Sequence, residues 1–184
     1  VVLCCFNRGY KLNPEVFDAW MRILAEVPDA VLWLLARPGE EMLERNLRRE
    51  MVRRGLDARR LQFTGARSNP DYLALYRVAD LFLDTWPYNA HTTASDALWA
   101  GCPVVTLRGE TFASRVAASL LTAVGLPELI TTDVDGYVRK AVALARDGTE
   151  RQRLRAFLDG PGRASALFDT AATTQALEAA YHAM

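Results

Sequence analysis

Short, continuous apolar runs alternate with longer amphipathic stretches along the chain, and this alternation constrains the fold more than any other feature of the sequence. The runs at residues 1–6 and 31–36 place apolar side chains at consecutive positions, not at every second one. Continuous runs are typical of strands that are covered on both faces, as in a parallel sheet. The same kind of run recurs at residues 61–64, 79–83, 104–106 and 129–130. These six runs are the predicted strands.

The stretches between the runs carry the periodicity and the end signals of helices. The first helix is expected to start at Pro14, with Asn13 as its N-cap, and to end before Pro28. A charged helix over residues 40–54 is expected to end at Gly55. Arginines crowd this region, but Glu residues interleave them, so we interpret it as a solvated helix face. Further helices are predicted over residues 70–77, 92–100, 112–124, 134–146, 150–158 and 171–182.

Strands that alternate with helices predict right-handed crossovers and a parallel sheet with helices on both faces. The predicted fold class is therefore α/β, a Rossmann-like doubly wound parallel sheet. The 184 residues suffice for one core, so we predict a single domain over 1–184, with 165–184 as its C-terminal segment and helix. The chain opens on a strand-like run without an initiator Met, and we expect it to be a piece of a longer protein.

Charge and composition argue against several classes of function. Lys plus Arg and Asp plus Glu number 22 each, so the net charge favours neither a nucleic-acid nor a membrane partner. No apolar run is long enough to span a bilayer, and no signal peptide is visible. Cys4, Cys5 and Cys102 lack metal-ligand spacing and are interpreted as small buried side chains. We therefore expect no metal site and a reducing, cytoplasmic location.

In doubly wound sheets ligands bind outside the carboxyl ends of the strands, and the most informative turn there is residues 84–96. It reads Asp-Thr-Trp-Pro-Tyr-Asn-Ala-His-Thr-Thr-Ala-Ser-Asp, and a helix is expected to begin near Thr92. Helix N-termini bind phosphate, and Thr92 and Thr93 add hydroxyl donors. His91 is a candidate donor to a phosphate, and Asp96 a candidate for ribose hydroxyls. Each residue alone fits an ordinary helix start, whereas the set indicates a nucleotide or nucleotide-sugar site.

The turn after the first strand offers Arg8 and Lys11, which can neutralise a phosphate, although a single Lys in a loop is more often solvated. This turn has one glycine and lacks Gly-x-Gly-x-x-Gly, and the chain has no Gly-Lys-Ser/Thr motif of P-loop proteins. A nucleoside triphosphatase is therefore disfavoured.

Two further turns carry candidate residues. Arg67 and Tyr72 follow the third strand, and Tyr72 fits either stacking on a base or packing in the core. Arg115 lies one turn into the helix that follows residues 104–106. We expect it to form a structural ion pair with Glu110 or Asp96 in preference to a catalytic role.

Several of these segments resemble the donor half of protein O-GlcNAc transferases and their SPINDLY relatives. Residues 7–14, Asn-Arg-Gly-Tyr-Lys-Leu-Asn-Pro, are similar to the Phe-Asn-x-x-Tyr-Lys-x-x-Pro turn of that family. Residues 83–106, with His-Thr-Thr followed by Asp-Ala-Leu-Trp-Ala-Gly, resemble its most specific block. Residues 27–35, 112–119 and 167–170 also resemble family segments in the family order. The resemblance covers nearly the whole chain.

This resemblance implies the C-terminal half of a GT-B glycosyltransferase, with a tetratricopeptide array upstream. The implied reaction is an inverting, metal-independent transfer of a sugar, GlcNAc from UDP-GlcNAc, to Ser or Thr of an acceptor protein, without a cofactor. Lys11 is implied to stabilise the departing diphosphate, and His91 to contact phosphate and sugar. The implied residues that bind the nucleotide sugar are Arg8, Arg67, Tyr72, Thr92, Thr93 and Asp96.

Some positions depart from the family pattern and leave alternatives open. Arg8 stands where the family motif has Gln, and Asn69 and Tyr72 stand where the animal enzymes carry Lys and His. GDP-fucose therefore remains an alternative donor, and a small-molecule acceptor or a nucleotide-sugar epimerase remains an alternative activity. A degenerate, non-catalytic scaffold is a further alternative, although the retained site residues argue against it. A flavodoxin-like regulatory domain is disfavoured, because no acidic cluster follows the first strand. The chain alone is expected to bind a donor weakly and to catalyse nothing.

Overall fold

Six parallel strands form a sheet in the order β3-β2-β1-β4-β5-β6. The computed structural model describes residues 1–184. The strands are β1 (Val2–Cys5), β2 (Val31–Leu35), β3 (Leu61–Thr64), β4 (Leu81–Leu83), β5 (Val104–Leu107) and β6 (Ile130–Thr131). The strand order reverses between β1 and β4, which leaves a crevice at the carboxyl ends of these two strands. The predicted doubly wound α/β sheet is confirmed.

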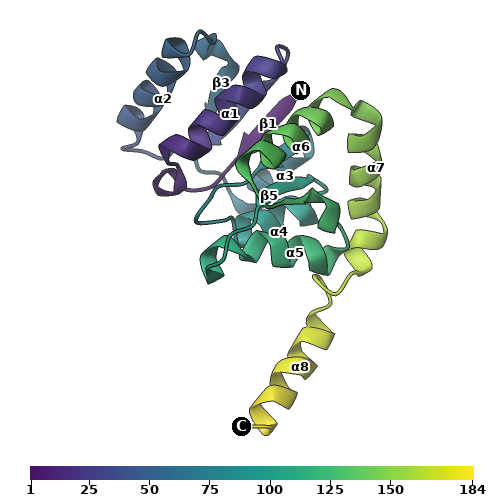
Figure 1. Ribbon diagram of the computed structural model, residues 1–184. Helices are drawn as coiled ribbons and strands as arrows, with labels where there is room; N and C mark the ends of the chain where they lie inside the picture. Colours follow the sequence, from purple (N-terminus) through teal and green to yellow (C-terminus); the bar gives the residue numbers. More distant parts are fainter.

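Helices cover both faces of the sheet (Figure 1). They are α1 (Pro14–Glu26), α2 (Glu41–Arg53), α3 (Asn69–Val78), α4 (Thr92–Trp99), α5 (Val116–Val124), α6 (Val134–Arg146), α7 (Gly148–Asp159) and α8 (Thr170–His182). α1 and α6 pack together on one face, with α2 beside α1, and α3, α4 and α5 follow one another on the other. None of these helices is both long and apolar enough to cross a membrane.

The helix ends follow local capping chemistry. Asn13 caps α1 by accepting a hydrogen bond from the N–H of Val16, as predicted. The single helix predicted over residues 112–124 is wrong. A 3-10 turn at Phe112–Ser114 precedes α5. It starts at a reciprocal capping box between Thr111 and Ser114, and Arg115 separates it from α5.

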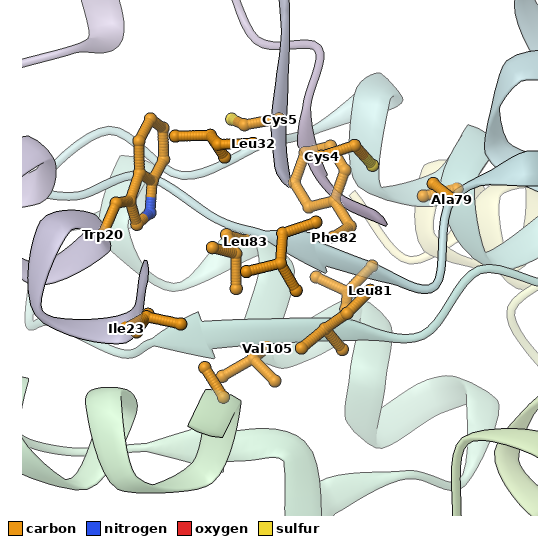
Figure 2. Packing of buried hydrophobic residues seen from close by; sticks show 14 of the residues in the cluster. Cys4, Cys5, Trp20, Ile23, Leu32, Ala79, Leu81, Phe82, Leu83 and Val105 are labelled. Carbon is orange, nitrogen blue, oxygen red and sulfur yellow. The ribbon is translucent and has the colours of Figure 1, made fainter. Parts of the chain in front are cut away.

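One hydrophobic core joins the strands to the helices on both faces. Figure 2 shows side chains of β1, β4 and β5 packed with Trp20 and Ile23 of α1. The buried indole N–H of Trp20 donates a hydrogen bond to the Tyr137 hydroxyl at 3.1 Å. The three cysteines are buried and unpaired, which confirms their interpretation as small apolar side chains.

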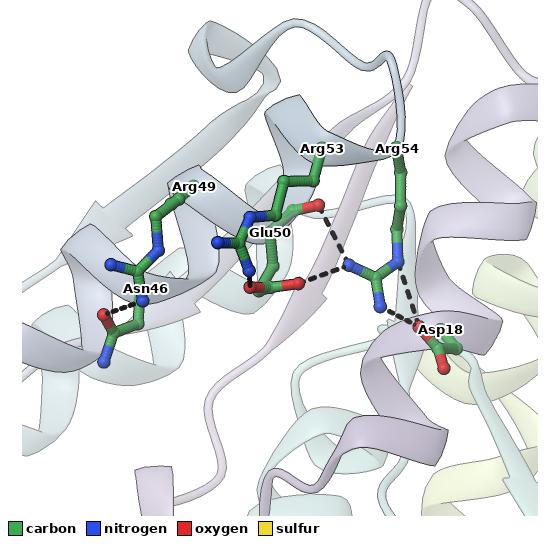
Figure 3. Close-up of polar contacts among 6 residues, drawn as sticks. All are labelled: Asp18, Asn46, Arg49, Glu50, Arg53 and Arg54. Atoms are coloured by element: carbon green, nitrogen blue, oxygen red, sulfur yellow. Dashed lines mark hydrogen bonds and ion pairs between the residues drawn. The ribbon is translucent and has the colours of Figure 1, made fainter.

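Several arginines around α2 form the predicted solvated, charge-paired face, whereas the partly buried side chains of Arg48 and Arg60 donate to backbone carbonyls. Arg53 pairs with Glu50 at 2.7 Å, and Arg54 pairs with Glu50 at 2.9 Å. Arg54 also pairs with Asp18 of α1, so α2 and α1 are joined at their surface (Figure 3). These ion pairs lie on the outside of the helical layer, away from the core.

The last helix, α8, extends away from the rest of the molecule (Figure 1). Every residue from Asp169 to Met184 is exposed. Asp169 caps the helix by accepting a hydrogen bond from the N–H of Ala172. α8 therefore adds nothing to the hydrophobic core.

Candidate functional site

A pocket of about 580 Å³ lies at the carboxyl edge of the sheet, where the strand order reverses. Its lining comes from the segments that follow β1, β2, β3 and β4. The structure brings seven of the eight predicted site residues to this pocket. They are Arg8, Lys11, Arg67, Tyr72, His91, Thr92 and Thr93. The rule that ligands bind beyond the strand ends therefore assembles residues that are far apart in the sequence.

Positive charge dominates the pocket. Arg8, Lys11, Arg37 and Arg67 line it, and no Asp or Glu does. The side chains of the three arginines form no hydrogen bond and no ion pair within the protein. Guanidinium groups suit bidentate contact with phosphate or carboxylate oxygens. The arrangement is therefore able to hold a ligand with more than one negative charge.

Lys11 is fixed at the floor of the pocket by two contacts from one loop. Its ammonium donates a hydrogen bond to the carbonyl of Asn89 at 2.8 Å. The same nitrogen lies 4.0 Å from the centroid of the Tyr88 ring, a cation–π contact. Partial burial lowers the pKa of Lys11, and the nearby charge of Asp84 acts in the opposite direction. The ammonium is thus held in place before any ligand arrives.

A buried carboxylate, Asp84, lies behind this loop and ties both of its ends. One oxygen accepts hydrogen bonds from the N–H of Thr85 at 2.8 Å and of Ala90 at 2.6 Å. The other accepts one from the Thr106 hydroxyl at 2.6 Å. Burial raises the pKa of Asp84 to about 7, although these three hydrogen bonds favour its charged form. Asp84 therefore sets the path of the chain from β4 to α4.

Further bonds within residues 85–90 make this loop rigid. The Thr85 hydroxyl donates to the carbonyl of Tyr88, and the Asn89 side chain donates to the carbonyl of Thr85, each at 2.7 Å. The Asn7 side chain donates to the Thr85 hydroxyl at 2.9 Å, which links the loop to the turn after β1. The carbonyl and ring that hold Lys11 are therefore fixed by the loop itself.

The N-terminus of α4 points free donors at the pocket. The N–H groups of Ala94 and Ser95 donate to the carbonyl of His91, whereas those of Thr92 and Thr93 have no acceptor in the protein. His91 makes no side-chain capping bond, and its buried Nε2 atom has no hydrogen-bond partner. Unsatisfied donors at a helix start are able to bind an anion. The predicted phosphate contacts of Thr92 and Thr93 stay a prediction.

Aromatic and aliphatic side chains form the opposite wall. Phe6, Leu35 and Tyr72 line the pocket, and the Phe6 and Tyr72 ring centroids are 6.1 Å apart. The hydroxyls of Tyr72 and Tyr76 lie 2.6 Å apart, and burial raises the pKa of Tyr72. Tyr72 is thus both part of the packed interior and part of the pocket wall, where a flat ring can lie against it.

Asp96 is the predicted site residue that does not line the pocket. It lies one turn along α4, half-buried, where burial raises its pKa. Its charge also contributes to the raised pKa of Tyr72, so the two side chains are neighbours. Its predicted contact with a ribose remains a prediction.

Sequence reasoning left out half of the fourteen pocket residues, among them Phe6 and Arg37. Arg37 follows β2, so the strand-end rule identifies it once β2 is recognised, and Tyr10 and Tyr88 lie within turns that were singled out. The predicted ion pair of Arg115 is wrong, because its side chain pairs with no carboxylate and lines a second hollow beside α5. No three His, Cys, Asp or Glu side chains lie close enough together to hold a metal ion.

Sequence and structure comparisons find relatives of this chain. The model of glycosyl transferase family 41 matches residues 1–177. The UDP-N-acetylglucosamine–peptide N-acetylglucosaminyltransferase of Caenorhabditis elegans is 41% identical over 171 residues, which are 92% of this chain and 14% of that protein. The Petunia hybrida protein named probable UDP-N-acetylglucosamine–peptide N-acetylglucosaminyltransferase SPINDLY is 35% identical over 181 residues, 97% of this chain and 19% of that protein.

A solved structure of a mutant Thermobaculum terrenum O-GlcNAc transferase superimposes with a TM-score of 0.91 at 38% identity. The match covers 98% of this chain and 35% of that one. The resemblance to O-GlcNAc transferases and SPINDLY proteins is thus confirmed. The chain spans less than a fifth of the length of the two curated relatives and about a third of that structure's chain.

Proposed function

The chain belongs to glycosyl transferase family 41, and on that premise we propose that its pocket binds the nucleotide-sugar donor of an inverting protein glycosyltransferase. The proposed reaction moves GlcNAc from UDP-GlcNAc to a Ser or Thr hydroxyl of an acceptor protein. The names of the relatives from C. elegans and Petunia hybrida support this donor and a peptide acceptor. The observation that carries the proposal is the group of three unpaired arginines and the preorganised Lys11 beside the free N–H groups of α4.

The diphosphate is proposed to lie between these cations and the start of α4. The N–H groups of Thr92 and Thr93 supply fixed donors, and the helix dipole adds a partial positive charge. The unpaired Nε2 of His91 lacks an acceptor, which a phosphate or sugar oxygen supplies. Because the protein provides this much positive charge, we expect donor binding and transfer to proceed without a divalent metal.

Lys11 is proposed to act on the leaving group. The acceptor oxygen attacks the anomeric carbon, and the bond from that carbon to the diphosphate oxygen breaks with its electron pair staying on the departing UDP. Charge on the diphosphate grows along this path, and a preorganised ammonium stabilises it most in the transition state. No carboxylate lines the pocket, so the base that takes the hydroxyl proton is expected outside this chain.

The base of the nucleotide is proposed to lie against Phe6 and Tyr72, with Arg67 and Asn69 at its edge. Stacking on an aromatic ring tolerates different bases, so this wall alone does not choose uracil over guanine. The ribose then extends toward Asp96 on α4. The buried, unpaired cysteines suit a reducing compartment, and we propose a cytoplasmic protein.

Calorimetric titration of the chain with UDP, GDP, UDP-GlcNAc and GDP-fucose tests the proposal, each with Mg²⁺ or with EDTA. We expect UDP and UDP-GlcNAc each to bind with the same affinity in the Mg²⁺ buffer as in the EDTA buffer. Arg67→Ala is expected to weaken binding by about tenfold, since it removes a charge-assisted hydrogen bond. Arg77→Ala is the matched control, because Arg77 is exposed at the far end of α3. Absence of binding by all four ligands, or an equal effect of the two variants, contradicts the proposal.

A further inference from the structure

A second hollow of about 670 Å³ lies beside the donor pocket, along α5. We call it the α5 groove, and its main lining residues are Arg108, Phe112, Arg115, Val116, Leu120 and Ile130. It lies beyond the carboxyl end of β5, because β5 leads into Arg108, and Ile130 of β6 pairs with Thr106 near that end. The groove thus occupies the place after β5 that the donor pocket occupies after β1 to β4.

Two arginines in the α5 groove have no partner. The side chains of Arg108 and Arg115 form no hydrogen bond and no ion pair, and both are exposed. Arginines elsewhere on the surface are mostly paired, as Arg53 and Arg54 are with Glu50 (Figure 3). Most of the unpaired arginines lie at the two hollows, with Arg45 and Arg77 as the exceptions. In the donor pocket they face the place proposed for the diphosphate. Carboxylates are the matching groups for the pair in the α5 groove.

Apolar side chains lie between and beside these charges. Val116, Leu120 and Ile130 are partly buried, and the Phe112 side chain is 82% exposed. An aromatic ring this exposed at the rim of a hollow is typical of an interaction surface. The groove therefore offers both apolar contact and positive charge.

The groove is joined to the donor pocket through one ring contact. The Phe112 and His91 rings meet edge to face with centroids 6.1 Å apart, and His91 lines the donor pocket. An extended polypeptide advances about 3.3 Å per residue. A chain seated in the α5 groove therefore reaches the donor sugar within a few residues.

We propose that the α5 groove docks a segment of the acceptor polypeptide in which carboxylate side chains flank an apolar residue. This inference rests on the proposed transfer to proteins. The apolar residue lies on Val116, Leu120 and Ile130, and the carboxylates pair with Arg108 and Arg115. Acceptor sites preceded or followed by acidic residues are then preferred over neutral ones.

The test is an NMR titration of the ¹⁵N-labelled chain with two blocked pentapeptides. One has leucine at its centre and aspartate at each end, and its twin has asparagine in place of aspartate. We expect the acidic peptide to shift the amide signals of Arg115, Ser119 and Ala123, which belong to the groove lining. The twin is expected to bind at least about fivefold more weakly. No shift at millimolar acidic peptide, equal shifts with both peptides, or shifts confined to other elements overturns the proposal.

Matched variants separate charge recognition from general binding. Arg115→Ala is expected to weaken the acidic peptide about fivefold, whereas Arg77→Ala, which removes an exposed arginine elsewhere, leaves its affinity unchanged. The Arg108→Glu/Arg115→Glu variant is expected to prefer a twin with lysine at both ends. If the double variant does not bind the lysine peptide more tightly than the aspartate peptide, the proposal is overturned. A parallel UDP titration, read at Thr92 and Thr93, reports on the donor site separately, so loss of peptide binding with intact UDP binding refutes the groove alone.

Discussion

Replacing Asp84 by Asn tests whether the carboxylate behind the donor pocket makes the stability of the fold depend on pH. Asp84 is fully buried, and burial raises its pKa from 3.8 to about 7. At pH values between these two pKa values, Asp84 is protonated in the folded protein and ionised in the unfolded chain. The free energy of unfolding therefore falls as pH rises. This contribution is complete below the unfolded pKa and is lost as pH rises through the folded pKa.

The size of the effect follows from the width of this pH window. Each pH unit inside it changes the free energy of unfolding by about 1.4 kcal/mol. From about pH 5 to about pH 7 the wild-type chain therefore loses about 2 kcal/mol through this group, because the slope is already halved at the folded pKa. Asn has nearly the same shape, and its oxygen can accept the bonds from Thr85 and Ala90. Its NH₂ group can donate to the Thr106 hydroxyl, so the variant removes the titration with little loss of hydrogen bonding.

Urea unfolding of both proteins, followed by tryptophan fluorescence at several pH values from about 5 to about 8, measures this difference. The useful quantity is the wild-type free energy of unfolding minus that of Asp84→Asn, because other titrating groups cancel. We expect it to fall by about 2 kcal/mol between about pH 5 and about pH 7. A difference independent of pH refutes the reasoning. It would mean that the three hydrogen bonds outweigh burial and keep the carboxyl ionised.

Three further predictions concern the pocket and the core. In the enzyme that contains this chain, Lys11→Ala is expected to lower turnover about 100-fold while the affinity for the donor changes far less. Steady-state kinetics together with a direct donor titration measures both quantities, and equal losses in turnover and affinity contradict a leaving-group role. Tyr72→Ala is expected to weaken UDP binding about tenfold, and Tyr72→Phe to leave the affinity for UDP nearly unchanged, as measured by calorimetry. Equal affinities of the two variants count against stacking. Trp20→Phe removes the donor to the buried Tyr137 hydroxyl and is expected to lower the free energy of unfolding by about 2 kcal/mol; a denaturation midpoint like that of the wild type contradicts this.

The sheet was predictable from the sequence because most residues of its strands are buried. Continuous apolar runs mark buried strands regardless of tertiary partners, and Asn13 marks the start of α1 through a bond to Val16, three residues away. The break at Phe112–Ser114 was not predicted, although its cause is local. A helical pattern and a capping box overlap at those residues, and the periodicity alone favours one continuous helix.

The site was predictable to the extent that it depends on strand ends. Arg8, Lys11 and His91 follow β1 and β4, the two strands at which the order reverses. Whether an arginine is paired depends on tertiary contacts, so Arg37 and Arg115 could not be told from solvated arginines by their sequence context. The role of Asp84 was hidden for the same reason, since one of its hydrogen bonds comes from the neighbouring strand β5.

The exposed helix α8 has a consequence for how the molecule fluctuates. A single helix of 13 residues without tertiary contacts is only marginally stable in water. Its backbone amides should therefore exchange with solvent through local fraying, and the amides of β1 and β4 only through much larger openings. Local opening of α8 and global opening of the sheet are therefore separate motions in one chain. A global unfolding curve measures the stability of the sheet and does not measure the fraying of α8.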